Sequence, residues 1–207
     1  MNDLSFQAGH GEIFAIAGVN GAGKSTLAKM PCGLQKNSSG TVLWAGKPMS
    51  RRMRRKKAYM VMQDVGHQLF TDSVAAECAL GIKAPNKDEI DRTLEKVDLL
   101  AYKERHPLSL SGGQMQRLAV VVSEICGKEL LVFDEPTSGL DLKSMEEVGT
   151  LTRSLATQGK VLLIITHDIE FMMRICTRIL FIRDGEIVED LSGGQKEKIV
   201  RLLRGEE

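Results

Sequence analysis

Short apolar runs recur along the chain, and most of them lack the strict alternation with polar residues that marks a half-exposed strand. The runs are Ile13–Ala17, Ala58–Met62, Leu130–Phe133, Val161–Thr166 and Arg178–Ile182. Unbroken apolar runs of this length are typical of strands that are covered on both faces, as in a parallel sheet. We therefore predict a mostly parallel sheet built from these runs.

Amphipathic stretches lie between the apolar runs. Apolar residues recur at helical spacing in Leu118, Val121, Val122 and Ile125, and in Ile90, Leu94 and Val97. The stretch 141–158 also reads as a helix, which Gly159 is placed to end. Because strands alternate with helices, we predict an α/β fold. Residues 64–110 show helical patterns without a convincing strand, which indicates a helical insertion.

A glycine-rich stretch follows the first apolar run. Residues 18–26 fit the pattern GxxxxGK[ST], between a predicted strand and a predicted helix, as the phosphate-binding loop requires. Glycines let backbone N–H groups turn toward a polyphosphate, and the helix N-terminus adds donors. Lys24 supplies a charge for the phosphates, and the Ser25 hydroxyl is suited to Mg²⁺. The alternative is a plain glycine turn.

Two carboxylates end the run Leu130–Phe133. Ligands of open α/β sheets gather at the carboxyl ends of strands. Asp134 is then placed to hold Mg²⁺, and Glu135 to orient and deprotonate a water. The alternative is a polar turn, since Pro136 follows at once.

With these motifs in order, the chain resembles the ATP-binding cassette (ABC) ATPases. The motifs are the phosphate loop at 18–26, Gln63 after the second apolar run, Leu-Ser-Gly-Gly-Gln at 110–114, the acidic strand end at Asp134 and Glu135, the segment 138–141, and His167 after the fourth run. The resemblance covers nearly the whole chain.

The resemblance implies the fold and its division. We expect an α/β P-loop NTPase core with a mostly parallel sheet, a helical subdomain insertion and a truncated antiparallel β-subdomain. Within a single domain over 1–207, the RecA-like core would span about 1–63 and 129–190, the helical subdomain about 64–128, and a C-terminal helix about 192–204.

The resemblance also implies a MgATP site. The expected catalytic residues are Glu135, His167 and Gln63, and the expected Mg²⁺ ligands are Ser25, Gln63 and Asp134. The expected ATP-binding residues are Asn20, Gly21, Ala22, Gly23, Lys24, Ser25, Thr26, Ser111, Gly113, Gln114 and Asp141. Ser111 to Gln114 would face ATP held by a second ABC ATPase, identical or different, so that hydrolysis opens the dimer.

A second Leu-Ser-Gly-Gly-Gln occurs at 191–195, after His167 and outside the motif order. Ser-x-x-Gln is a capping box, and Ile199, Leu202 and Leu203 follow at helical spacing. We predict that Ser192 caps the C-terminal helix and contacts no nucleotide. Substituting Gly113 would then abolish ATP hydrolysis, and the same change at Gly194 would not.

A narrower resemblance is to the ATPases of energy-coupling-factor (ECF) importers, which take up vitamins or metal ions. It rests on Gln63-Asp64 and on residues 68–74, which would contact an integral membrane partner. The chain would then lie on the cytoplasmic face of a prokaryotic membrane and bind no nucleic acid. The alternatives are a soluble ABC ATPase serving repair, translation or cofactor assembly, and a nucleotide-binding module that does not hydrolyse ATP.

The chain departs from the family pattern at two places. An N-terminal strand with an adenine-stacking aromatic is expected upstream of Leu4 and is missing, and Phe6 comes too late in the order to replace it. We therefore expect weaker recognition of the base. Pro31 falls in the helix expected after Lys24, where a proline costs ~3 kcal/mol, unless the helix ends near Gly33.

Charge and cysteine content narrow the picture further. The net charge is +1, which gives no overall field for nucleic acid or a membrane. Basic residues crowd the range 51–57, which we interpret as a solvated face, with an anionic partner as the alternative. The four cysteines form no CxxC pair, which argues against zinc and disulfides and fits a reducing compartment.

Overall fold

A sheet of 6 strands in the order β4-β5-β6-β1-β7-β8 crosses the computed structural model, which describes residues 4–36, 39–192, 195, 198 and 200–202. Its strands are β1 (Ile13–Gly18), β4 (Ala58–Val61), β5 (Leu130–Asp134), β6 (Val161–Ile165), β7 (Arg178–Arg183) and β8 (Glu186–Ser192). The first five are parallel, and β8 pairs antiparallel with β7. Every predicted run is a strand, with ends shifted by a residue at most.

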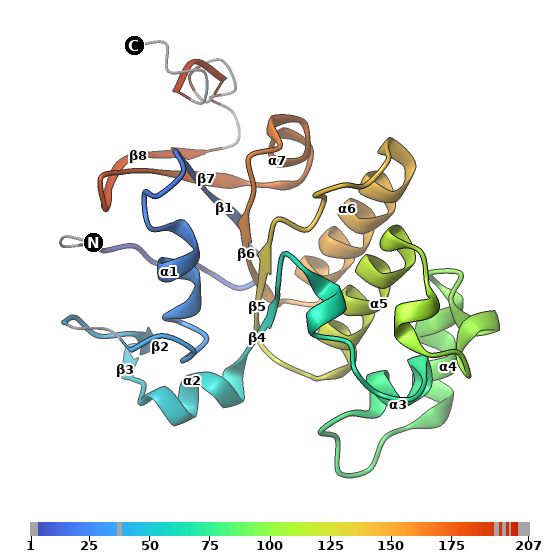
Figure 1. Cartoon of the computed structure of the whole chain (residues 1–207). Coiled ribbons are helices and arrows are strands. Elements are labelled where there is room, and N and C mark those ends of the chain that lie inside the picture. The colour runs from blue at the N-terminus through green and yellow to red at the C-terminus, as the bar shows by residue number, and fades with distance from the viewer. Residues whose placement is uncertain (1–3, 37–38, 193–194, 196–197, 199, 203–207) are drawn as a thin grey trace.

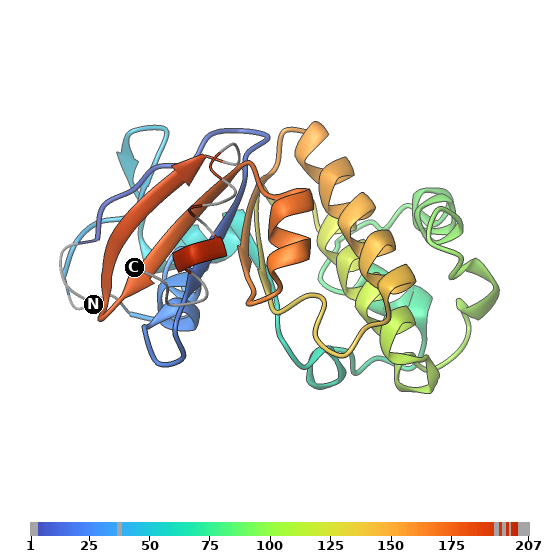
Figure 2. The same cartoon turned by 90° about the horizontal axis from the view of Figure 1, so that it is seen from above.

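Helices cover both faces of the sheet (Figures 1 and 2). Helix α1 (Lys24–Lys29) packs on one face, and α5 (Gly112–Ile125), α6 (Leu142–Thr157) and α7 (Ile169–Ile175) pack on the other. In β5, Val132 turns toward α1 while Leu131 and Phe133 turn toward α5, α6 and α7. Both faces of β5 are therefore apolar, which explains its unbroken apolar run.

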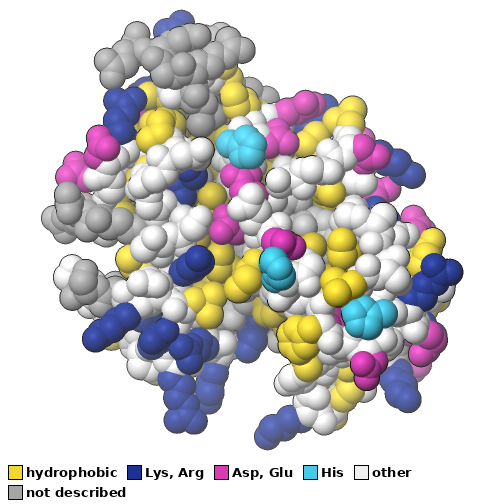
Figure 3. All heavy atoms as spheres, in the orientation of Figure 1, with side chains coloured by type: hydrophobic (Ala, Val, Ile, Leu, Met, Phe, Trp, Pro, Cys, Tyr) yellow, Lys and Arg dark blue, Asp and Glu magenta, His cyan; other side chains and the backbone are white. Residues whose placement is uncertain are grey.

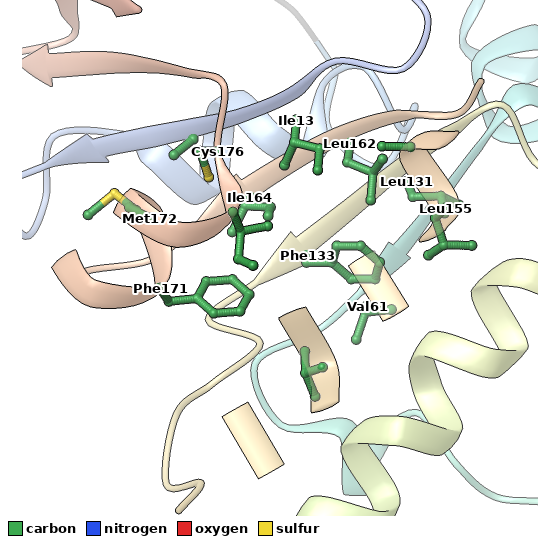
Figure 4. Close-up of a cluster of buried hydrophobic side chains, with 14 of the residues drawn as sticks. Ile13, Val61, Leu131, Phe133, Leu155, Leu162, Ile164, Phe171, Met172 and Cys176 are labelled. Atoms are coloured by element: carbon green, nitrogen blue, oxygen red, sulfur yellow. The ribbon is translucent and has the colours of Figure 1, made fainter. Parts of the chain in front are cut away.

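The larger apolar layer lies between the sheet and α5, α6 and α7. Figure 4 shows Phe133 and Ile164 of the sheet beside Phe171 of α7. Phe133 and Ile164 are 0% exposed, and each such side chain contributes about 1.5–3 kcal/mol relative to an exposed one. This layer therefore holds the carboxyl ends of β5 and β6 in position.

Residues 64–110 form short helices, as predicted, and none of these described residues lies in a strand. The elements are η1 (Val65–His67), α3 (Val74–Ala79), α4 (Lys87–Glu95), η2 (Leu100–Tyr102) and η3 (Pro107–Ser109). Their apolar side chains pack on the face of α5 that carries Leu118, Val121 and Val122. The opposite face of α5, with Ala119 and Val120, packs on the sheet. Helix α5 thus belongs to both cores.

Helix α1 is shorter than the expectation for this segment, and it ends before Pro31. The helix stops at Lys29 with Met30 as its C-cap, so no proline lies in its interior. The chain then turns through Gly33, which has φ +68°. A Cβ on Gly33 would lie 2.5 Å from the carbonyl oxygen of Arg51, so the turn depends on glycine.

The basic residues 51–57 form α2 (Arg51–Lys57), and several of them have structural partners. Arg54 donates to the Met30 carbonyl at 2.6 Å, and Arg55 donates to the Gly33 carbonyl at 3.0 Å. These arginines therefore satisfy carbonyls at the C-cap of α1 and in the turn that follows it. Lys and Arg side chains gather around the position of α2 in Figure 3.

The small antiparallel pair consists of β2 (Leu43–Trp44) and β3 (Lys47–Pro48), neither of which the apolar pattern predicts. Phe6 lies against Phe14 of β1 with ring centroids 5.7 Å apart. Phe6 is thus part of the apolar layer on the α1 face, and this contact agrees with its exclusion as a base-stacking residue.

The expected helix at 192–204 does not begin at Ser192, and this prediction is wrong. Ser192 is the last residue of β8, paired with Arg178, and Gln195 is not helical. Within the described part of the tail, residues 198 and 200–202 are helical. Strand β7 pairs with β8 along its length, and this pairing includes Ser192.

Among the described residues, every helix is too short or too polar to span a lipid bilayer.

Candidate functional site

The loop after β1 has the backbone of a phosphate cradle. Gly21 has φ +84° and Gly23 has φ +95°, values that L side chains rarely adopt. Gly18 pairs with Ile182, whose carbonyl oxygen would lie 2.1 Å from a Cβ at position 18. Gly23 is the N-cap of α1 and offers no side-chain cap, which leaves the first N–H groups of α1 open to a ligand.

Lys24 lies across its own loop. Its Nζ donates to the carbonyl of Gly18 at 2.8 Å and to that of Val19 at 2.9 Å. The ammonium is therefore held over the loop by neutral acceptors. A bound phosphate would offer it an anionic acceptor instead, which makes a stronger hydrogen bond.

Asp134 ends β5 beside the start of α1. Burial raises the pKa of its carboxyl, the charge of Glu135 raises it further, and a hydrogen bond from Ser25 together with Lys29 and Lys24 acts in the opposite direction. The folded chain therefore holds an anion at a place where its charge is poorly solvated. A cation at this position would favour the ionised form.

Glu135 and His167 come together from the ends of β5 and β6. The Nδ1 atom of His167 lies 2.9 Å from Oε1 of Glu135. The Glu135 side chain is 13% exposed, and its Oε2 is buried without a hydrogen-bond partner in the described chain. Its backbone has φ +51°, which a glutamate rarely adopts. Such strain and an unsatisfied acceptor are common at functional sites.

Gln63 is less closely connected to the carboxyl edge of the sheet than Asp134, Glu135 and His167 are. It follows β4 at the same sheet edge, is exposed, and makes no hydrogen bond with Ser25 or Asp134 among the described contacts. The nearby Gln68, the first residue of the segment 68–74, holds this loop instead. Its amide donates to the Tyr59 hydroxyl at 2.9 Å and accepts from the Met62 N–H at 3.0 Å.

The segment 110–114 starts α5, on the face of the sheet opposite α1. Ser111 and Gln114 form a reciprocal capping box, as the sequence indicates. Gly112 has open space where a Cβ would be, whereas a Cβ on Gly113 would lie 2.6 Å from Ser144 Oγ. A side chain at position 113 would therefore have to displace the Ser144 hydroxyl, which the motif alone does not reveal.

Asp141 starts the neighbouring helix α6. Its Oδ1 accepts the Ser144 N–H at 2.8 Å, and hydrogen bonding by Ser144 holds the pKa of Asp141 below its ordinary value. The predicted residues therefore fall into two groups. The loop 20–26, Asp134, Glu135 and His167 share the carboxyl edge of the sheet. Ser111, Gly113, Gln114 and Asp141 lie at the starts of α5 and α6.

The second Leu-Ser-Gly-Gly-Gln lies at the other end of the sheet. Leu191 pairs with Ile179 at the start of β7, whereas Gly18 of the phosphate loop pairs with Ile182 near its end. Gln195 lines a surface hollow with Thr177 and Arg178 at the amino ends of the strands. Gly193 and Gly194 lie outside the described residues.

The side chains at the carboxyl edge fit Mg²⁺ in type. The Ser25 hydroxyl and the Asp134 carboxylate are oxygen ligands, which Mg²⁺ prefers. Among the described residues, no group of three His, Cys, Asp or Glu side chains could hold a metal ion. A Mg²⁺ ion would thus need phosphate oxygens and water to complete its shell, as is usual for this ion.

Comparisons with known proteins agree with this geometry. The ABC transporter family matches residues 1–138. An ABC transporter ATP-binding protein of Treponema denticola is 57% identical over 203 residues, which are 98% of this chain and 42% of that protein. A relative from Streptomyces avermitilis is 35% identical over 93% of this chain and 76% of its own length. The chain thus spans about two fifths of the Treponema protein.

Two solved structures are similar. The structure of cbiO1 from Clostridium perfringens, part of the ABC transporter complex cbiONQ, has a TM-score of 0.82 and 29% identity. The matched region covers 95% of this chain and 83% of the cbiO1 chain. A nucleotide-free ATP-binding cassette has a TM-score of 0.84 at 21% identity over 95% of this chain and 87% of its own, which supports the fold alone.

Gly112 provides a test of whether the start of α5 meets a nucleotide. We expect Gly112→Leu to leave the melting temperature within a few degrees of wild type, because nothing within the chain occupies that space. ATP hydrolysis should fall roughly 10²-fold or more, because the side chain would block an approaching phosphate. Gln195→Leu, in the second copy of the motif, is the control. Equal activity of the two variants would contradict the assignment.

Proposed function

Since the chain belongs to the ABC transporter family, we propose that it binds and hydrolyses MgATP at the carboxyl edge of its sheet and thereby energises a membrane transporter. The observation that carries the proposal is the meeting of the phosphate loop, Asp134, Glu135 and His167 at that edge. Any one of these features is common, but their convergence from three strands supports catalysis rather than binding alone.

Each residue then has a distinct role. The backbone of residues 20–26 binds the phosphates, and Lys24 moves from its carbonyl partners to the β- and γ-phosphates. Ser25, Asp134 and Gln63 would hold Mg²⁺, which would supply positive charge to neutralise the charge that develops on the phosphates. Gln63 reaches this position only if its exposed loop moves inward.

Glu135 orients and deprotonates the attacking water. Its buried, unpartnered Oε2 is the atom available for that water, while Oε1 is engaged by His167. His167 is 80% exposed, and its ring can exchange the hydrogen bond to Glu135 for one that it donates to the γ-phosphate once nucleotide is bound. The histidine thus links the state of the phosphate to the position of the base.

A second cassette completes the site. Ser111, Gly113, Gln114 and Asp141 lie across the sheet from α1, which supports a role for them toward ATP held by another ABC ATPase, identical or different. The open space at Gly112 and the N-terminal donors of α5 suit a phosphate approaching from outside. Contacts to the γ-phosphate would close the pair, and hydrolysis would release it.

For the transporter, we infer an ECF-type importer of a vitamin or metal ion, with the chain on the cytoplasmic face of the membrane. The segment after Gln63 supports this, as does the likeness to cbiO1. Phe70 in this segment is 67% exposed. Oε2 of the buried Glu77 accepts from the Phe70 N–H at 3.1 Å and holds the loop in place. A fixed, exposed aromatic is suited to docking a membrane partner.

Replacement of the candidate base tests hydrolysis directly. Glu135→Gln should lower steady-state phosphate release roughly 10²–10⁴-fold, because the amide cannot accept the proton of the water. ATP binding should remain. Glu129→Gln changes a glutamate just before the same strand, where its partner is Lys57, and should hydrolyse ATP as wild type does. Wild-type turnover in Glu135→Gln would contradict the assignment of Glu135 as the base, and a wild-type chain that releases no phosphate would leave only the non-hydrolysing module.

Co-purification from the source membrane tests the importer. Tagged wild-type chain should retain an integral membrane protein in mild detergent, and Phe70→Ser should retain roughly tenfold less of it. Leu43→Ser is the control, since Leu43 is also exposed at 56% but lies on β2. Quantitative mass spectrometry measures the recovery. If no membrane protein depends on Phe70, a soluble ABC ATPase becomes the better description.

A further inference from the structure

Arg117 joins three parts of the chain that are distant in sequence. It lies on α5, one turn beyond Gln114, with a side chain that is only 13% exposed. Its Nε donates to the carbonyl of Val97, at the end of the segment that follows α4, at 3.2 Å. Its Nη1 forms an ion pair with Glu147 of α6. One guanidinium therefore connects α5 and α6 with the short helices of residues 64–110, called the helical segment below.

A close contact between Gly113 and the side chain of Ser144 lies beside this ion pair. Gly113 at the start of α5 approaches Ser144 so closely that a Cβ would lie 2.6 Å from its Oγ. Ser144 in turn donates its N–H to Asp141 at 2.8 Å. The starts of α5 and α6 thus touch at Gly113 and are tied a turn later by Arg117. Two contacts of this kind fix both the separation and the register of the helices.

The ion pair is more than a surface contact. A guanidinium so far removed from water is costly unless acceptors replace the water, and Arg117 has a carbonyl and a carboxylate. The two acceptors lie on different elements and are reached by different nitrogens of one planar group. This fork geometry suits arginine and not lysine.

We propose that Arg117 is a positioning residue that holds residues 111–114 and 138–141 as one rigid unit and anchors that unit to the helical segment at Val97. The reason for such a unit rests on the function proposed above, in which both segments meet a nucleotide held by another cassette. A displacement of one segment relative to the other would misplace donors around the phosphate. Arg117 itself touches no nucleotide.

Kinetics of Arg117 variants test this role. Arg117→Ala should lower kcat roughly tenfold to a hundredfold, since small misplacements of catalytic groups have effects of that size. The Kd of the isolated chain for ATP should stay within about twofold, because the phosphate loop lies on the other face of the sheet. Arg117→Lys should fall between wild type and Arg117→Ala, since it retains the charge but not the fork.

Arg178 supplies a matched control. Its side chain is 22% exposed, it donates to the carbonyl of Gln7, and it pairs with Glu12 and Asp190 at the amino edge of the sheet. Arg178→Ala should destabilise the chain at least as much as Arg117→Ala while leaving kcat unchanged. A kcat that follows the melting temperature in both variants would overturn the proposal, as would wild-type kcat in Arg117→Ala.

Hydrogen exchange without nucleotide separates this inference from the proposed function. In Arg117→Ala, the hydrogen-bonded amides of residues 114–117 and 144–147 should both exchange faster, and in Arg178→Ala they should exchange as in wild type. If wild type hydrolyses no ATP, the proposed function fails while exchange still decides the role of Arg117. Unchanged protection at either helix start would overturn the rigid unit.

Discussion

The parallel arrangement of five strands is the constraint on which the site depends. Each strand that runs in the same direction delivers its carboxyl end to the same edge, so the residues that follow β1, β5 and β6 must meet there. The apolar layers on both faces bury these strand ends. Asp134 and Glu135 therefore end in a poorly solvated position beside each other, and Glu135 has a strained backbone. Such local violations are tolerated where a ligand compensates for them.

Helix α5 is buried on two sides, because it packs both on the sheet and on the helical segment. Its residues Ala119 and Val120 pack on the sheet, and Leu118 and Val121 pack on the helical segment. Because α5 is held on two sides, the N–H donors at its N-terminus have a fixed position, which depends on both apolar clusters. The second Leu-Ser-Gly-Gly-Gln lacks this setting, because its Leu191 and Ser192 end an edge strand at the opposite end of the sheet. The same Leu-Ser pair thus leads into a helix cap in one context and ends a strand in the other.

The sequence was sufficient for the features that follow from periodicity and from motif order. Unbroken apolar runs predicted the five parallel strands, and the phosphate loop lies between β1 and α1 as its pattern requires. The failures come from long-range pairing. Ser192 has a good local capping box, but β8 gains more from pairing with β7. The contact of Gly113 with Ser144 and the three-way role of Arg117 join residues at least 20 positions apart, which no local pattern encodes.

Thermal denaturation of Asp134→Asn tests the central claim that this edge is held ready for a cation and phosphates. Burial and Glu135 raise the pKa of Asp134 above its ordinary value of 3.8, so the ionised carboxylate makes the folded chain less stable. Without ligand, the variant should melt at a higher temperature than wild type at pH 7. The gain should shrink as the pH falls through the raised pKa toward 3.8, where wild-type Asp134 is protonated. MgATP should raise the melting temperature of wild type more than that of the variant. A variant that is less stable without ligand, or that MgATP stabilises as much as wild type, would contradict the account.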